Sequence, residues 1–445
     1  MSPKGHFVRA PVKQDYPRTK EILEHVGPLP SVPKQGKVLN EKDLHDNLTS
    51  FRELNKTTTV IKFPGPELDI PMYINEFWTS RQRMGHSLHE ISYRACFKPQ
   101  LPRFFIERLT RFGDVVYDPF MGRGTTPIEA ALMGRKPFGS DINPLGKILV
   151  NPRLHPPDLS EIEGRLSQID LEPKTIIQGD LSAFYHNQTL KRITNLRNYL
   201  ALRREKGEFD YLDDWIRMVA TNRLTGHSPG FFSVYTLPPN QAISIKSQLK
   251  INRDHGQIPP DRDVKEIILR KSRSMLRKLD DVQRLQLYNS KKDAFFITGT
   301  SEHTPEIRNE SVNLVVTSPP FLDVVSYQKD NWLRCWFNDI DPTTVPIWQI
   351  RKSEEWQLKM TKVFHELRRV LVPGGFIAFE VGEVRRGKLL LETLVVPAAI
   401  NANLEPLLII INDQRFTKTA NCWGVSNLKK GTNTNRIILI QKSIR

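Results

Sequence analysis

The residues most suggestive of chemistry are Ser318-Pro319-Pro320-Phe321, which follow an apolar run at 312–316. Consecutive prolines hold the backbone extended and leave carbonyl oxygens exposed, because proline has no amide hydrogen. The Ser318 hydroxyl and the carbonyl of Ser318 or Pro319 could accept both hydrogens of an exocyclic base amine, directing its lone pair toward an electrophile. Phe321 could stack on that base. The structural alternative is a helix that starts at the two prolines, with Phe321 in the core.

A glycine-rich turn occupies residues 118–126, between a predicted strand and a predicted helix. Gly122 and Gly124 would let the backbone approach a ligand where a Cβ would clash, and the helix start presents free N–H groups. The next predicted strand ends at Asp141, where an acid can accept the ribose hydroxyls of a nucleoside. Alternatively, Asp141 caps a helix that begins near Asn143. The predicted contacts of a nucleoside cofactor are Asp118, Pro119, Phe120, Gly122, Gly124, Thr125, Asp141 and Asn143.

Together, these two segments resemble the amino-methylating DNA methyltransferases, which act on N4 of cytosine or N6 of adenine. The resemblance covers residues 85–150 and 290–441. It implies S-adenosylmethionine as the cofactor, a catalytic role for Ser318, Pro319, Pro320 and Phe321, and a target base flipped out of the DNA helix. Serine at position 318 resembles the cytosine-N4 members, whereas aspartate is usual there in adenine-N6 members.

The resemblance implies two further cofactor contacts. Residues 93–102 resemble the family segment that helps to hold the methionine end, although Leu101 stands where lysine is commoner. The family often has an acid after the third strand that faces the adenine. Two candidates remain open for this position: the segment Gly299-Thr300-Ser301-Glu302, and Asp180.

Strands and helices must alternate to position these residues. Helices are predicted at 125–133 and 354–370, and strands at 115–118, 136–141, 295–297, 312–316, 375–381, 406–411 and 436–441. This alternation predicts an α/β fold with a mostly parallel sheet. The resemblance implies the Rossmann-like methyltransferase type, with seven strands of which the last is antiparallel. The cofactor would lie across the carboxyl ends of the first two strands.

Four regions are predicted: a basic N-terminal arm at 1–75, a cofactor-binding half at 76–150, an inserted target-recognition region at 151–290, and a catalytic half at 291–445. Within the insert, residues 246–292 hold 13 Lys or Arg against 6 Asp or Glu. The candidate DNA contacts are Arg253, Arg262, Arg270, Lys271, Arg273, Arg277 and Lys278, for which a solvated helix face is the alternative. The loop at 225–232 could enter a DNA groove or pack beneath one.

Composition narrows the partners and excludes other chemistries. A net charge of +16 favours a polyanionic partner. The three cysteines are far apart, which predicts neither disulfides nor zinc, and none follows a proline as the nucleophile of cytosine-C5 methylation does. The histidines lack metal-site spacing, so no metal is expected. No membrane span or secretory signal is recognised, so a cytoplasmic location is expected.

We therefore predict a site-specific methyltransferase that modifies cytosine N4 in double-stranded DNA, in a restriction-modification context with a companion endonuclease acting on the same site. Adenine-N6 methylation and amine methylation of RNA by the same core are the alternatives. A non-catalytic DNA-binding protein is a third, against which the intact Gly122, Gly124, Asp141 and Ser318 argue.

Overall fold

The computed structural model describes residues 38–52, 56–64, 69–78, 85–94, 96–172, 180–237, 242–320, 322, 327–384, 389–413 and 434–444. In this part of the chain, nine strands form one sheet in the order β1-β2-β10-β11-β7-β6-β3-β4-β5, and β8 pairs with β9 separately. The strands are β1 (Thr59–Lys62), β2 (Pro71–Asn75), β3 (Val115–Asp118), β4 (Lys136–Asp141), β5 (Phe295–Thr298), β6 (Val312–Thr317), β7 (Leu371–Val381), β8 (Glu383–Val384), β9 (Leu389–Leu390), β10 (Glu405–Asp413) and β11 (Thr434–Gln441).

The strand directions confirm the predicted α/β methyltransferase fold. Strands β5, β4, β3, β6 and β7 are parallel to one another, and β11 is antiparallel to both of its neighbours. The predicted count of seven is wrong, because β2 pairs in parallel with β10 and β1 pairs with β2. These two strands cover the edge of β10, whose backbone groups would otherwise lack partners. Residues 59–62 and 71–75 thus belong to the sheet and not to an arm beside it.

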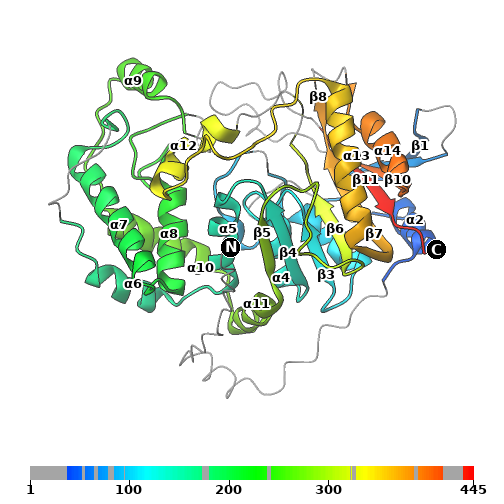
Figure 1. Cartoon of the computed structure of the whole chain (residues 1–445), viewed down its shortest axis with the longest axis horizontal. Helices are drawn as coiled ribbons and strands as arrows, with labels where there is room; N and C mark the ends of the chain where they lie inside the picture. The colour runs from blue at the N-terminus through cyan, green and yellow to red at the C-terminus, as the bar shows by residue number, and fades with distance from the viewer. Residues whose placement is uncertain are drawn as a thin grey trace, which may run out of the picture.

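Helices cover both faces of the sheet (Figure 1). Along β6, Leu314 and Val316 pack with side chains of α2 (Glu41–Thr49) and α3 (Gln100–Leu109). Between them, Val315 points to the other face and packs with side chains of α13 (Ser353–Val370) and α14 (Glu392–Asn401). Because both faces are buried, β6 is apolar along most of its length. The cofactor-binding half adds α4 (Thr125–Leu132), α5 (Leu145–Val150), and the short 3-10 turns η2 (Ser87–His89) and η3 (Asn151–Leu154).

A lobe of helices lies beside the sheet, on the left in Figure 1. Its core holds Leu196, Trp215, Ile268 and Met275, together with Leu333 from the catalytic half. Among the described residues, no helix is both long enough and apolar enough to cross a membrane. The lobe contains α6 (Leu159–Gln168), α7 (Asn187–Glu205), α8 (Tyr211–Arg223), α9 (Ile245–Asp254), α10 (Val264–Leu276) and α12 (Tyr327–Phe337). The next helix after α10, α11 (Asp281–Asp293), contacts α4 and β4.

Candidate active site

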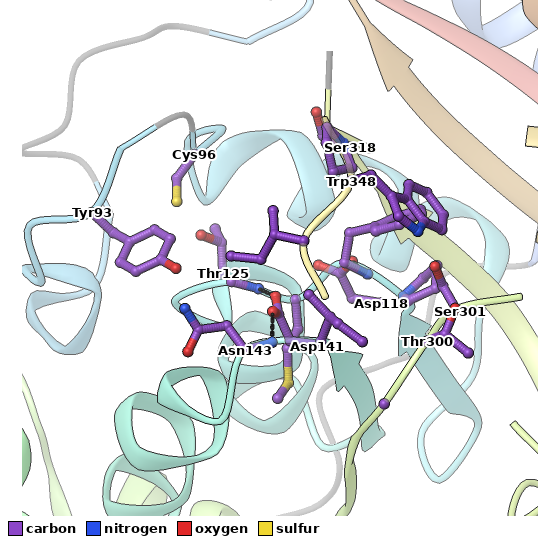
Figure 2. A pocket seen from close by; sticks show the side chains of 18 of the residues that line it. Tyr93, Cys96, Asp118, Thr125, Asp141, Asn143, Thr300, Ser301, Ser318 and Trp348 are labelled. Carbon is purple, nitrogen blue, oxygen red and sulfur yellow. Dashed lines mark hydrogen bonds between the residues drawn. The ribbon is translucent and has the colours of Figure 1, made fainter. Parts of the chain in front are cut away.

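A cleft opens where β3, β4, β5 and β6 end, the edge at which open α/β sheets bind ligands (Figure 2). It encloses about 860 Å³, counting the solvent-filled mouth. Residues from six separate stretches of the chain line it: Tyr93, Cys96, Phe97, Asp118, Pro119, Phe120, Met121, Gly122, Thr125, Asp141, Ile142, Asn143, Gly299, Thr300, Ser301, Ser318, Pro320, Ile347 and Trp348. The structure thus brings most of the predicted cofactor and catalytic positions together.

The two glycines of the turn have different roles. Gly122 lines the cleft with a φ of +48°, which an L side chain rarely adopts. Gly124 has a φ of +77° but is not among the cleft residues, because it packs against α5. A Cβ on Gly124 would lie 2.1 Å from Val150 Cγ2. Gly124 therefore makes room for a neighbouring helix, and its contact with a cofactor stays a prediction.

Asp141 is locked in place by the turn that it faces. Its Oδ2 accepts the Gly122 N–H at 2.8 Å, and its Oδ1 accepts the Asn143 N–H at 2.8 Å. Burial raises the pKa of the Asp141 carboxyl. Asn143 Oδ1 in turn accepts the N–H of Leu145, the first residue of α5, at 3.0 Å. Asp141 therefore presents a preoriented carboxyl group to the cleft.

Asp118 joins the first strand to the catalytic strand beneath the cleft. Its carboxyl accepts hydrogen bonds from Thr317 Oγ1 at 2.6 Å and from the Phe120 N–H at 3.0 Å. The side chain is 1% exposed, and burial raises its pKa to about 7 against the effect of these hydrogen bonds. Since Thr317 directly precedes Ser318, Asp118 ties the glycine-rich turn to the predicted catalytic segment.

The end of β6 supplies the predicted catalytic segment. Ser318 and Pro320 line the cleft, and Pro319 is buried beside them. Phe321 lies outside the described residues. The Pro320 carbonyl accepts the Trp356 Nε1–H at 2.8 Å, which anchors the segment to α13. This contact uses the Pro320 carbonyl. It does not involve the predicted acceptors of the amine hydrogens, which are the Ser318 hydroxyl and the Ser318 and Pro319 carbonyls.

Glu380 is a site residue that the sequence did not reveal. It lies on β7 beside the end of β6, because Thr317 pairs with Phe379 in the sheet. Its carboxyl accepts a hydrogen bond from Asn435 Nδ2 at 2.8 Å. Burial raises the Glu380 pKa to about 7, although the nearby Ser318 side chain acts to lower it. Its one signal in the sequence is a single acid within the apolar run 376–381.

The two candidates for the adenine end are separated by the structure. Gly299, Thr300 and Ser301 line the cleft, whereas the neighbouring Glu302 pairs with Lys359 Nζ at 3.0 Å. Asp180 is exposed, accepts a hydrogen bond from the Ser182 N–H at 3.0 Å, and is not among the cleft residues. The segment after β5 therefore borders the cleft through small side chains and not through an acid.

Two further parts of the cleft come from outside the glycine-rich turn and the catalytic segment. Tyr93, Cys96 and Phe97 belong to the segment expected at the methionine end. Ile347 and Trp348 belong to the connection between α12 and α13, which carried no recognised motif. An apolar pair within a mostly polar connection was the available signal.

Some of the predicted DNA contacts are exposed side chains, and others form ion pairs or hydrogen bonds within the protein. Arg253, Arg270 and Arg273 are exposed on α9 and α10, although Arg270 also donates to the Pro229 carbonyl at 3.2 Å. Lys271 and Arg277 both form ion pairs with Glu90, and burial, helped by Arg223, lowers the pKa of Lys271 to about 8. Arg262 is half-buried, and Lys278 Nζ donates to the Gly85 carbonyl at 3.0 Å. Lys271 and Arg277 thus connect α10 to the cofactor-binding half.

Comparison with known proteins finds similarity to DNA methyltransferases. A family model described as DNA methylase, of the N6 and N4 type, matches residues 37–146, which include the glycine-rich turn and Asp141. The chain is 23% identical over 308 residues to the Type II methyltransferase M.MvaI of Kocuria varians. The chain is thus similar to the amino-methylating DNA methyltransferases in its cofactor-binding half and along much of its length. The M.MvaI match covers 64% of this chain and 61% of that protein, so the chain spans about three fifths of its relative.

A further relative and two solved structures are also similar to parts of the chain. M.MjaII of Methanocaldococcus jannaschii is 34% identical over 95 residues, which cover 21% of this chain and 17% of that protein. Among solved structures, a putative DNA modification methylase from Thermus thermophilus aligns at 23% identity over 31% of this chain and 47% of that chain, with a TM-score of 0.19. A geranyl diphosphate C-methyltransferase from Streptomyces coelicolor A3(2) aligns at 9% identity over 78% and 76%, with a TM-score of 0.32.

Proposed function

We propose that this protein transfers a methyl group from S-adenosylmethionine to the N4 amine of cytosine in double-stranded DNA, as part of a restriction-modification pair. The observation that supports this most is the position of Ser318. Its side chain lines the cleft that contains Asp141 and lies near the buried carboxyl of Glu380, whose pKa it acts to lower. A hydroxyl backed by a carboxyl suits a substrate amine that must give up a proton.

The chemistry of the cleft suits S-adenosylmethionine. Asp141 offers a carboxyl group to ribose hydroxyls, and Ile142, Phe120 and Met121 offer apolar surface. The amino-terminal end of α4, which begins at Thr125, offers a partial positive charge to a carboxylate.

When bound, the cofactor supplies an electrophilic methyl group. Ser318 Oγ and the Pro319 carbonyl would accept the two amine hydrogens and orient the nitrogen lone pair into the cleft. The methylated amine carries one surplus proton, which Ser318 Oγ accepts while its own hydroxyl proton moves to the Glu380 carboxylate. A pKa of about 7 lets Glu380 take up and release this proton near neutral pH.

The helical lobe provides a surface for duplex DNA. Strand β7 leads directly into β8, so the carboxyl ends of the parallel strands face the side of the molecule on which β8 and α9 project (Figure 1). On this side, α9 exposes Lys246, Lys250 and Arg253. Phosphate contacts by these side chains would hold DNA beside the cleft and allow a flipped base to reach Ser318.

Nucleoside mass spectrometry of DNA incubated with the protein and S-adenosylmethionine tests the assignment. We expect N4-methylcytosine; N6-methyladenine as the sole product would overturn the base assignment, and modification of RNA alone would overturn the DNA assignment. Ser318→Ala should lower turnover by about 10- to 1000-fold while cofactor affinity stays near normal. Ser311→Ala is the matched control, because Ser311 lies at the opposite end of the same strand.

A further inference from the structure

The connection between α12 and α13 places an aromatic ring in the wall of the cleft. Trp348 has its ring centroid 5.8 Å from that of Phe120, edge to face, and Lys359 Nζ lies 5.3 Å over the Trp348 ring. The connection has no strand or helix at this point, and the Ile347 N–H bonds locally to the Val345 carbonyl at 2.8 Å. Side-chain packing in the cleft therefore holds this ring.

Trp348 lies at one end of the cleft. In Figure 2, Tyr93 and Cys96 lie on one side of Asp141, and Thr300, Ser301 and Trp348 lie on the other. A nucleoside whose ribose hydroxyls are held at Asp141 must direct its base and its 5′ substituent to opposite ends, because the base stands on C1′ and the 5′ carbon on C4′, the two ring carbons that flank the diol.

Each end suits a different part of the cofactor. The Tyr93 end includes Thr125, where the amino-terminal end of α4 favours a carboxylate, and so it suits the amino acid part. The other end combines an indole ring with the small side chains of Thr300 and Ser301, which leave room for a flat ring and offer hydroxyl groups to its edge.

We propose that Trp348 is the stacking surface for the adenine ring of S-adenosylmethionine, which makes it a cofactor-positioning residue. This inference rests on the function proposed above. Phe120 and Lys359 set the orientation of the indole, and Glu302 holds Lys359 through an ion pair at 3.0 Å. The family resemblance implies an acid near the adenine. In this chain the Trp348 ring, supported by Phe120 and Lys359, takes that place.

Calorimetry with S-adenosylhomocysteine tests the proposal on the full-length protein. Trp348→Phe keeps an aromatic face and should bind within about threefold of wild type, whereas Trp348→Ala should bind at least about tenfold more weakly. Binding should also quench the emission of Trp348, so part of the wild-type quenching should disappear in Trp348→Phe. Trp336→Phe is the matched control, because Trp336 lies half-buried on α12 away from the cleft.

The outcomes separate the two proposals. Equal affinity of Trp348→Ala and wild type, with thermal melting that shows both to be folded, would overturn the role of Trp348 and leave the proposed function standing. Normal cofactor affinity with weakened DNA binding would place the ring against the target base, which also overturns the proposal. No binding of S-adenosylhomocysteine by the wild-type protein would overturn the proposed function and this inference with it.

Discussion

The buried carboxyl of Glu380 makes stability depend on pH in a way that a single substitution isolates. Burial raises the Glu380 pKa from its ordinary 4.5 to about 7. Between these values, the folded protein keeps a proton that the unfolded chain releases, so the free energy of unfolding falls as pH rises. At about 1.4 kcal/mol per pH unit, the whole effect is about 3.4 kcal/mol, of which about 2.5 kcal/mol falls between pH 5 and pH 8.

Glu380→Gln removes this titration and keeps the shape of the side chain. The free energy of unfolding of the variant, minus that of wild type, should therefore rise by about 2.5 kcal/mol between pH 5 and pH 8. Urea denaturation at the two pH values measures this change. Any hydrogen bond gained or lost on substitution adds the same offset at both pH values and cancels. Turnover at pH 8 should fall by about 100-fold, because the amide cannot accept the proton from Ser318.

Glu366→Gln is the control. Although burial acts to raise its pKa, hydrogen bonds from Arg369 and Thr304 outweigh it and lower the Glu366 pKa to about 2. Glu366 is thus ionised throughout pH 5 to pH 8 in the folded protein and largely so in the unfolded chain, and the stability difference should stay nearly constant. If the Glu380→Gln difference were equally constant, Glu380 would be ionised at pH 5 and could not act as a proton acceptor that titrates near neutrality.

Three further substitutions test other parts of the site. Asp141→Ala should weaken S-adenosylhomocysteine binding by about 1.5–3 kcal/mol in calorimetry, and unchanged affinity would limit Asp141 to holding the turn. Gly124→Ala should destabilise the protein by about 1–3 kcal/mol in thermal or urea unfolding, because the left-handed backbone and the packing of α5 leave no room for a Cβ. Gly164→Ala is its control, since nothing lies within 4 Å of a Cβ there. Replacing Arg253 and Arg273 together by Glu should weaken DNA binding and reduce its salt slope by about 2, and an unchanged slope would move the DNA surface elsewhere.

The sequence alone determined the parts of the site that are local in the chain. The glycine-rich turn, Asp141 and Ser318 each follow directly on a predicted strand. Because parallel strands end at the same edge of a sheet, three local patterns were enough to predict one shared site. The same alternation of strands and helices predicted the α/β fold, since periodicity along the chain reports which segments are buried on both faces, whereas the antiparallel last strand was implied by the family resemblance.

Only the tertiary structure decided which distant segments meet. Strands β1 and β2 join the sheet because β10 has an edge to cover, and no local pattern announces a free edge. Glu380 reaches Ser318 through the register of β7 against β6, and Trp348 reaches Phe120 through an irregular connection. Residue type and spacing report the chemistry that a side chain can perform and the face on which it lies. The neighbour that shifts its pKa, fills its space or pairs its charge is set by packing between segments far apart in the chain.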